Sequence, residues 1–246
     1  MKQMVSIANE GFRYGRGVFE TLLVQDAVAL FKDWHLESII KAAEQLSLST
    51  PSQADLAQVS LNAQQHRGIW RWFITEDGFH TLWQNEVPPV QEAMSLGLSP
   101  LTVNAQLWEV RFKTLSYLSH IQAREQSDAD ECVLLNERGE IASASMANIF
   151  WIKDQKVYTP LASCGCREGV IRRWLMEKSG YEVEQGRWKH EALYKADEIF
   201  LTNSRIGIVP VTSWQDLSYP IGKLTRQLQL KYASSIENNR AFGAKH

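Results

Sequence analysis

The chain has 246 residues, of which 44% are hydrophobic, and its formal net charge is -2 at pH 7. This is enough apolar material for one large core or two modest ones. The charge and a pI near 6.3 argue against a constitutive nucleic-acid-binding protein, which usually carries a basic surface. No apolar run reaches the roughly 18 residues of a membrane-spanning helix, and the first residues lack the apolar core of a signal peptide. We therefore expect a cytoplasmic protein of enzyme size, with no nucleic-acid or membrane partner.

Three cysteines, Cys132, Cys164 and Cys166, make an odd number and do not suggest a disulfide framework. Cys164 and Cys166 have the spacing of half a metal site. No second pair or histidine cluster accompanies them, so we predict that the chain binds no metal.

The first half of the chain, residues 1–88, predicts a small α+β domain. Two β-rich segments separated by a two-residue turn are typical of a hairpin. Apolar residues at helical spacing predict the first helix, and a second helical stretch follows a proline. The expected strands lie at 18–24, 27–31, 69–74 and 80–83, and the expected helices at 34–47 and 51–66.

The second half, residues 89–246, predicts a larger domain. A Pro-Pro step within 86–90 is the best candidate for a linker. Beyond it strand-like and helical segments alternate, so the whole chain predicts an α/β fold. The expected strands lie at 94–99, 130–136, 147–153, 156–159, 181–186, 197–202 and 208–213, and the expected helices at 115–126, 168–179 and 221–235.

No P-loop, Gly-x-Gly-x-x-Gly or His-Glu-x-x-His motif is present, but several weaker segments follow one another in a distinctive order. They are Gly11–Thr21, His35–Ile39, Lys113–Leu118, Asp130–Leu135, Gly139–Ser143 with Ala147–Trp151, Glu168–Arg172, and Asp197–Ser204 with Pro210-Val211. In order and spacing these segments resemble the fold-type IV pyridoxal-phosphate enzymes, the class IV aminotransferase superfamily. The resemblance extends over nearly the whole chain. It implies a D-amino-acid-aminotransferase-like fold, a pyridoxal 5'-phosphate cofactor and a homodimer.

Within this superfamily the chain looks most like the aminodeoxychorismate lyases. Leu96–Pro100, Asn148–Trp151 and Thr202–Ser204 carry this narrower resemblance, together with the short length. It implies a lyase that cleaves the small molecule 4-amino-4-deoxychorismate to 4-aminobenzoate and pyruvate, a step of folate biosynthesis. One alternative is a branched-chain or D-amino-acid transaminase on the same fold. A second alternative is a non-catalytic relative whose cofactor site has degraded.

The resemblance gives Lys113 the role of the catalytic lysine that binds the cofactor covalently and moves protons. An amine buried beside a cofactor loses its proton more readily, because desolvation disfavours the ammonium form. Tyr117 matches a position that often faces the phenolic oxygen of the cofactor, although a place in a helix core is an alternative.

The phosphate of the cofactor needs backbone N–H donors and hydroxyl groups, which the start of a helix can provide. Gly169, Val170 and Ile171 begin the helix expected at 168–179, so we expect their amides to bind the phosphate. The resemblance assigns the hydroxyl of Ser204 to the same task. Asn203 either lines the site or caps a turn.

The chain departs from the superfamily at three positions. Ser38 stands where an arginine usually binds the phosphate, and losing that bond costs about 1.5–3 kcal/mol of affinity. Ser143 stands where a glutamate usually lies beneath the pyridine nitrogen of the cofactor. Glu76 and Asp77 occupy a place where many relatives have an arginine that binds a substrate carboxylate.

The replacement of glutamate by Ser143 favours a lyase over a transaminase. A hydroxyl group does not keep the pyridine nitrogen protonated, so the cofactor withdraws electrons less strongly. Transamination depends on a well-stabilised carbanion, whereas an elimination that ends in an aromatic product has its own driving force. The competing interpretation is that Ser38 and Ser143 together mark a degraded cofactor site.

Overall fold

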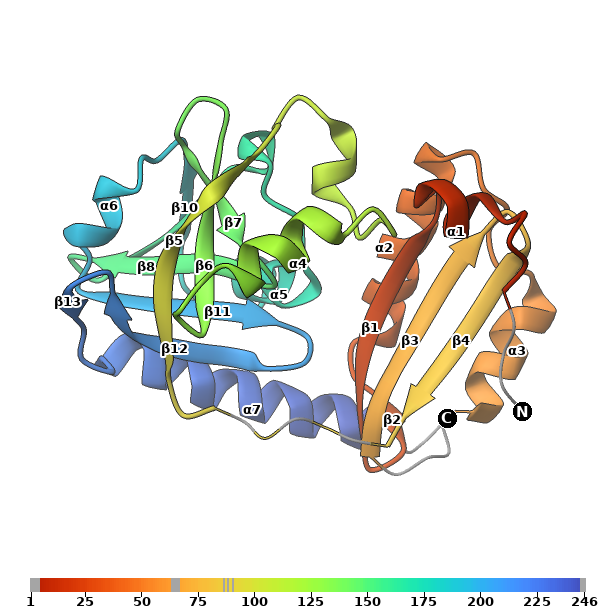
Figure 1. The fold of residues 1–246 in the computed structure, drawn as a ribbon. Helices are drawn as coiled ribbons and strands as arrows, with labels where there is room; N and C mark the ends of the chain where they lie inside the picture. The colour runs from red at the N-terminus through yellow and green to blue at the C-terminus, as the bar shows by residue number, and fades with distance from the viewer. Residues whose placement is uncertain (1–4, 63–66, 86, 88, 90, 244–246) are drawn as a thin grey trace. The chain divides into compact units, whose positions relative to one another are not determined.

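The computed structural model describes residues 5–62, 67–85, 87, 89 and 91–243. The chain forms two compact units. The smaller unit comprises Met1–Pro88, Phe112–Tyr117 and Ile236–His246, and the larger unit comprises Pro89–Arg111 and Leu118–Ser235. Both units combine helices and sheets (Figure 1), so the predicted α/β fold class is confirmed. The linker expected at 86–90 lies partly outside the described residues.

The smaller unit is built on a four-stranded antiparallel sheet with the order β2-β1-β3-β4. The two residues between β1 and β2, Asp26 and Ala27, have φ values of 48° and 62°. Positive φ at both central residues is the requirement of a tight two-residue hairpin, so the predicted hairpin is confirmed. The strands are β1 (Val18–Gln25), β2 (Val28–Ala29), β3 (Arg67–Thr75) and β4 (Gly78–Gln84).

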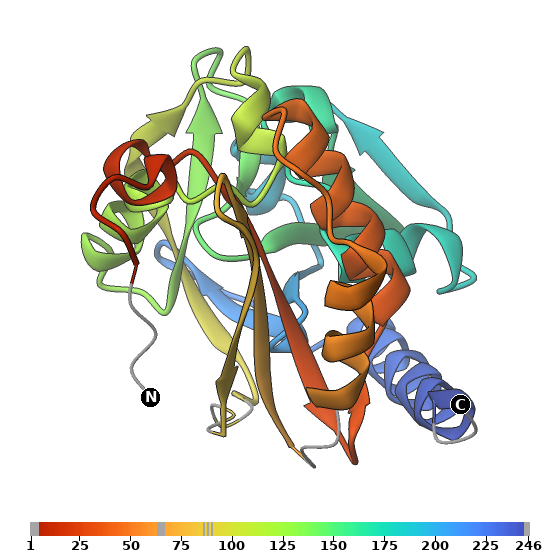
Figure 2. The ribbon, with the colours of Figure 1, turned by 90° about the vertical axis from the view of Figure 1, so that its right-hand side faces the viewer.

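Helices α2 (Lys32–Gln45) and α3 (Gln53–Asn62) accompany this sheet (Figure 2). Alternate residues of β1 and β3 project toward α2 and form the core of the unit with its apolar face. This core includes Leu22, Ile39, Trp70 and Trp72, each no more than 1% exposed. The last residues of the helix expected at 51–66 lie outside the described part of the chain.

The sequence did not predict the short helix α1 (Glu10–Tyr14), which precedes the sheet. The acidic pair of the β3–β4 turn holds its start. Nδ2 of Asn9 donates to Oδ2 of Asp77 at 2.6 Å, and the amide of Glu10 donates to Oε1 of Glu76 at 2.8 Å. In this chain the acidic pair of the turn therefore anchors the start of the N-terminal helix.

The larger unit is built on a nine-stranded mixed sheet with the order β10-β9-β8-β11-β12-β5-β6-β7, in which β13 also pairs with β12. Neighbours are antiparallel except for β9 with β10, β5 with β12 and β5 with β6. The strands are β5 (Met94–Val103), β6 (Glu131–Asn136), β7 (Ile141–Ala144), β8 (Asn148–Lys153), β9 (Lys156–Pro160), β10 (Val183–Gly186), β11 (Glu198–Asn203), β12 (Gly207–Trp214) and β13 (Leu217–Ser218).

The helical elements of the larger unit are shorter than predicted, apart from the last one. The helix expected at 115–126 begins only at Leu118, because residues 112–117 form a non-helical segment that belongs to the smaller unit. The elements are η1 (Trp108–Arg111), α4 (Leu118–Glu125), η2 (Ala162–Cys164), α5 (Val170–Glu177), α6 (Glu191–Tyr194) and α7 (Lys223–Gly243). No helix in the described part of the chain is long and apolar enough to cross a membrane.

The three cysteines are free and buried. Burial raises the pKa of each thiol, so these side chains behave as apolar core groups at neutral pH. Among the described residues, no group of three His, Cys, Asp or Glu side chains is placed to hold a metal ion.

Candidate active site

Lys113 precedes Thr114, which forms an isolated antiparallel bridge with Val18 at the start of β1. The amide of Phe19 donates to the carbonyl of Lys113 at 2.8 Å, and the amide of Leu115 donates to the carbonyl of Gly17 at 2.9 Å. Facing residues of paired strands project to the same side. The side chain of Lys113 therefore lies on the same side of the sheet as Phe19.

Phe19 brings Lys113 and Tyr117 together. Nζ of Lys113 lies 4.4 Å from the centre of the Phe19 ring. The ring of Tyr117 meets the same ring edge-on, with 5.4 Å between the centroids. Both Lys113 and Tyr117 are half-buried. Two of the predicted site residues thus contact one aromatic side chain.

Arg71 is a candidate site residue that the sequence reasoning missed. In the β1–β3 register Phe73 faces Phe19, so Arg71, two residues earlier, projects to the same side as both rings. Arg71 is half-buried, and its Nε is buried without a hydrogen-bond partner among the described residues. One feature of the sequence could have pointed to Arg71: it is an arginine between Trp70 and Trp72, in a strand whose alternate residues are buried.

Ser38 lies on the opposite, helix-covered side of the sheet, against Glu20. Its Oγ donates to Oε1 of Glu20 at 2.9 Å, while Nδ1 of His35 lies 2.8 Å from Oε2 of the same carboxylate. Glu20 and His35 are 6% and 1% exposed, so this is an interior network. These contacts give no support to Ser38 as a cofactor ligand, and that assignment stays a prediction.

The start of α5 is buried and has no side-chain cap among the residues that the structure describes. Gly169 is the N-cap residue and supplies no side-chain cap, and the first helical residues, Val170 and Ile171, are 5% and 1% exposed. A Cβ added to Gly169 would lie 2.4 Å from Oδ1 of Asn148, so glycine is required by this close approach. A buried, uncapped helix start is an unusual arrangement that an anion would satisfy.

Thr202 supplies a further unsatisfied group close to the start of α5. Thr202 on β11 faces Asn148 on β8 in the antiparallel register, so both side chains lie on the same side of the sheet. Oγ1 of Thr202 is buried and has no hydrogen-bond partner among the described residues. Asn148 contacts Gly169, which links this hydroxyl to the helix start. In the sequence Thr202 belongs to the segment Asp197–Ser204, and no local pattern predicts a role for its hydroxyl.

The turn after β11 contains Asn203 and Ser204. Oδ1 of Asn203 accepts hydrogen bonds from the amides of Arg205 and Ile206, both at 2.9 Å, and its Nδ2 donates to the carbonyl of Met146 at 3.0 Å. Asn203 therefore caps the turn and ties it to the loop after β7. Ser204 is half-buried in the same turn.

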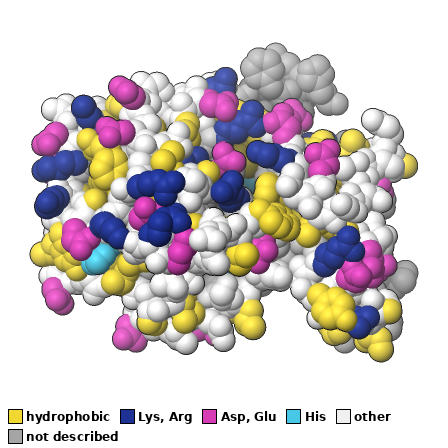
Figure 3. All heavy atoms as spheres, turned by 90° about the horizontal axis from the view of Figure 1, so that it is seen from above, with side chains coloured by type: hydrophobic (Ala, Val, Ile, Leu, Met, Phe, Trp, Pro, Cys, Tyr) yellow, Lys and Arg dark blue, Asp and Glu magenta, His cyan; other side chains and the backbone are white. Residues whose placement is uncertain are grey.

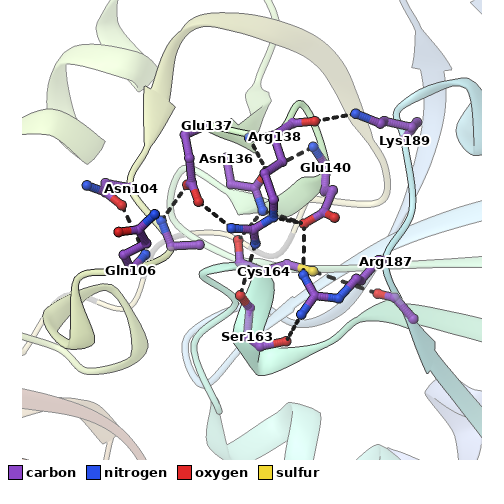
Figure 4. Close-up of polar contacts among 12 residues, drawn as sticks. Asn104, Gln106, Asn136, Glu137, Arg138, Glu140, Ser163, Cys164, Arg187 and Lys189 are labelled. Atoms are coloured by element: carbon purple, nitrogen blue, oxygen red, sulfur yellow. Dashed lines mark hydrogen bonds and ion pairs between the residues drawn. The ribbon is translucent and has the colours of Figure 1, made fainter.

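Ser143 lies on β7, where it faces Leu134 of β6 and is 6% exposed. A charged cluster fixes the turn before this strand (Figure 4). Oε2 of Glu140 accepts from Nδ2 of Asn136 at 2.8 Å, Nε of Arg138 at 2.9 Å and Nη1 of Arg187 at 3.5 Å.

Burial acts to raise the pKa of the Glu140 carboxyl, but hydrogen bonds from Asn136 and Arg138 hold it below its ordinary value. Figure 3 shows that Lys and Arg side chains are interspersed with Asp and Glu on the face seen from above. Because Arg138 and Arg187 are paired with Glu140, the cluster supports the turn before β7.

Comparison with known proteins identifies the family of the chain. The model of the family Amino-transferase class IV matches residues 17–214. The aminodeoxychorismate lyase of Bacillus subtilis is 29% identical, over 96% of this chain and 90% of its own length, and that of Vibrio harveyi is 26% identical, over 92% and 94%. The crystal structure of 4-amino-4-deoxychorismate lyase from Pseudomonas aeruginosa superposes with a TM-score of 0.84 at 23% identity, covering 95% of this chain and 96% of that one.

The chain therefore belongs to the class IV amino-transferase family and is a pyridoxal-phosphate-dependent enzyme. Each unit by itself contains groups of the kind that this cofactor needs. Lys113 has a half-buried amine, the group that condenses with an aldehyde. The start of α5 has amide donors of the kind that a phosphate accepts, and the hydroxyl of Thr202 has no partner among the described residues.

Proposed function

We propose that this enzyme is a lyase that cleaves 4-amino-4-deoxychorismate to 4-aminobenzoate and pyruvate. The observation that carries the proposal is the half-buried amine of Lys113, packed on Phe19 and beside Tyr117, in a chain whose relatives over nearly its whole length include aminodeoxychorismate lyases. When bound, pyridoxal phosphate supplies an electron sink for the bond that breaks next to the substrate amine.

Within the proposal, Nζ of Lys113 has two tasks. It binds the cofactor covalently, and once released it takes the ring proton of the substrate and returns a proton to the departing enolpyruvyl group. Phe19 limits the positions that the lysine side chain can adopt, since the ring lies 4.4 Å from Nζ. Tyr117, held edge-on against Phe19, contributes a phenol group to the same side of the sheet.

The phosphate is assigned to the amides at the start of α5, namely those of Val170 and Ile171 beside the N-cap Gly169. Thr202 joins this set because its buried hydroxyl has no other described partner. Ser204 remains assigned to the phosphate by resemblance, whereas Asn203 acts as the residue that fixes the turn carrying it.

Ser143 favours the lyase over a transaminase because its side chain is uncharged. It is an uncharged hydroxyl on a buried strand, so it leaves the pyridine nitrogen of the cofactor without an anionic partner at this position. An elimination that creates an aromatic ring depends less on a protonated nitrogen than transamination does.

Arg71 is proposed to bind a carboxylate of the substrate, which carries two such groups. The guanidinium projects to the side of the sheet on which Phe19 and Lys113 lie, and its buried Nε has no hydrogen-bond partner within the described part of the chain. An arginine in this state favours an anionic ligand. Arg71→Leu is expected to raise KM for 4-amino-4-deoxychorismate by at least about tenfold, which corresponds to about 1.4 kcal/mol. Arg67→Leu, at the exposed start of the same strand, is the control and should leave KM unchanged.

The test of the function is a direct assay with 4-amino-4-deoxychorismate. The proposal predicts equal amounts of 4-aminobenzoate and pyruvate from the loaded enzyme and from Lys156→Ala, which alters an exposed lysine on β9. It predicts no release above background from Lys113→Ala. Pyruvate release by Lys113→Ala at the parent rate would refute it. Faster conversion of a branched-chain or D-amino acid to its oxo acid would favour the transaminase alternative.

Three finer assignments accompany this proposal: a role in folate biosynthesis, a cytoplasmic location and a homodimeric state. They rest on the reaction and on the resemblance to the family. Sedimentation of the purified protein tests the dimer independently of the reaction.

A further inference from the structure

Glu131, the first residue of β6, is a buried carboxylate with an unusual number of donors. It is 3% exposed. Its Oε1 accepts from the amide of Cys132 at 3.0 Å, from the amide of Ser145 at 3.1 Å and from the Ser145 hydroxyl, and its Oε2 accepts from the amide of Met146 at 2.9 Å. Three of these four donors belong to one short loop, residues 145–147, which joins β7 to β8.

This loop adjoins several segments that carry predicted cofactor contacts. It follows Ser143 on β7 and precedes Asn148 on β8, and Asn148 packs against Gly169 at the start of α5. The carbonyl of Met146 accepts from Nδ2 of Asn203 at 3.0 Å. The position of the loop therefore affects the Asn203 turn directly and the start of α5 through one residue.

A second contact holds the loop from α4. Nδ1 of His120 lies 2.8 Å from the carbonyl of Ser145. This contact fixes a carbonyl, whereas Glu131 fixes two amides and a hydroxyl of the same loop. A buried polar group left without its partner costs more than the bond itself contributes. Removal of the carboxylate would take this acceptor from the Met146 amide and the Ser145 hydroxyl, whereas the Ser145 amide also donates to the carbonyl of Cys132 at 2.9 Å.

We propose that Glu131 is a positioning residue of the cofactor site: by holding residues 145–147 it sets the geometry of Asn203 and of the α5 start that binds the phosphate. The inference rests on the proposed role of these residues toward pyridoxal phosphate and not on the identity of the substrate. Burial, which outweighs the donated hydrogen bonds, raises the pKa of the Glu131 carboxyl, and Arg124 acts weakly in the other direction. The donors, not an ion pair, are thus the main partners of this group.

The test compares Glu131→Ala and Glu131→Gln with a matched control. Glu198→Gln alters another buried glutamate, 9% exposed, whose carboxylate accepts from the amides of Leu224 and Thr225 at the start of α7. The apoprotein of each variant is titrated with pyridoxal phosphate, its thermal unfolding is recorded, and amide hydrogen exchange is followed in 144–148 and 202–206.

We expect Glu131→Ala to weaken pyridoxal-phosphate binding by about tenfold or more and to speed exchange in both segments. Glu131→Gln should have an intermediate effect. Its NH2 group would face the Met146 amide, two donors that cannot bond to each other, in place of Oε2, which accepts a hydrogen bond from that amide. Glu198→Gln should lower the unfolding temperature and leave cofactor affinity unchanged.

The inference is overturned if the Glu131 variants bind the cofactor as the parent does while exchange in 145–147 is faster. It is also overturned if Glu198→Gln weakens binding equally, since that would show a general loss of stability. If Glu131→Ala does not fold, the inference is tested with Glu131→Gln, by its affinity for pyridoxal phosphate and its amide hydrogen exchange. A parent protein that binds pyridoxal phosphate but does not cleave 4-amino-4-deoxychorismate would refute the proposed reaction and leave this inference standing.

Discussion

Replacement of Gly169 by alanine tests whether the start of α5 binds the cofactor phosphate. The backbone at Gly169 has φ -68°, which alanine adopts easily, so the effect comes from the added Cβ, 2.4 Å from Oδ1 of Asn148. Asn148 is 2% exposed, and its Nδ2 donates to the carbonyl of Arg167 at 2.7 Å. Moving it would leave a buried group unsatisfied, at about 1–3 kcal/mol. We therefore expect the helix start to shift instead.

A shift of the helix start moves the amides of Val170 and Ile171 away from the phosphate. A hydrogen bond to a charged group contributes about 1.5–3 kcal/mol. Since about 1.4 kcal/mol corresponds to one factor of ten, losing one such bond predicts a Kd for pyridoxal phosphate about tenfold to a hundredfold higher.

The assay is a titration of the apoprotein of Gly169→Ala, followed by visible absorbance, with thermal unfolding measured in parallel. Gly97→Ala is the control: its Cβ would lie 3.0 Å from Oγ of Ser127, a hydroxyl that can rotate, so cofactor affinity should not change. Parent-like affinity in Gly169→Ala would refute the assignment of the phosphate to α5.

Two further predictions concern side chains that form hydrogen bonds with or through a carboxylate. Ser38→Ala removes a hydrogen bond to Glu20, so denaturant unfolding should show a loss of about 1 kcal/mol, with cofactor affinity unchanged; a large loss of affinity would instead make Ser38 a cofactor ligand. Asp130 accepts from the amide and the hydroxyl of Ser95, which lower the pKa of its carboxyl, so its ionised form stabilises the fold above the unfolded pKa of about 3.9. Asp130→Asn should therefore lower the unfolding temperature at pH 7, and the difference from the parent should fade as the pH falls through the folded pKa; a difference that persists in acid would contradict this.

The sequence was sufficient for the architecture and for the order of the main elements. Hydrophobic alternation and turn chemistry predicted the β1–β2 hairpin, and helical spacing predicted α2. It did not predict β7 (Ile141–Ala144), because four residues rich in alanine and serine carry little strand signal. It also missed α1, a five-residue helix held mainly by Asn9 and the acidic turn.

The sequence predicted the candidate site residues that belong to a recognisable motif. It did not predict those whose importance depends on their burial in the folded chain. Lys113 and Gly169 came from segments that resemble a family. Arg71 and Thr202 emerge only when the strand register and the unsatisfied atoms are known. The role of Glu131 depends on which loop folds back onto it, a non-local contact that no local pattern specifies.

The central claim is that one amine, on Lys113, binds the cofactor covalently. The most direct measurement is to reduce the cofactor-loaded protein with borohydride, digest it and locate the modified peptide by mass spectrometry. We expect the pyridoxyl group on the peptide that contains Lys113, and we expect it to be lost in Lys113→Ala. Modification of a different lysine in the parent protein, or no modified peptide at all, would contradict it.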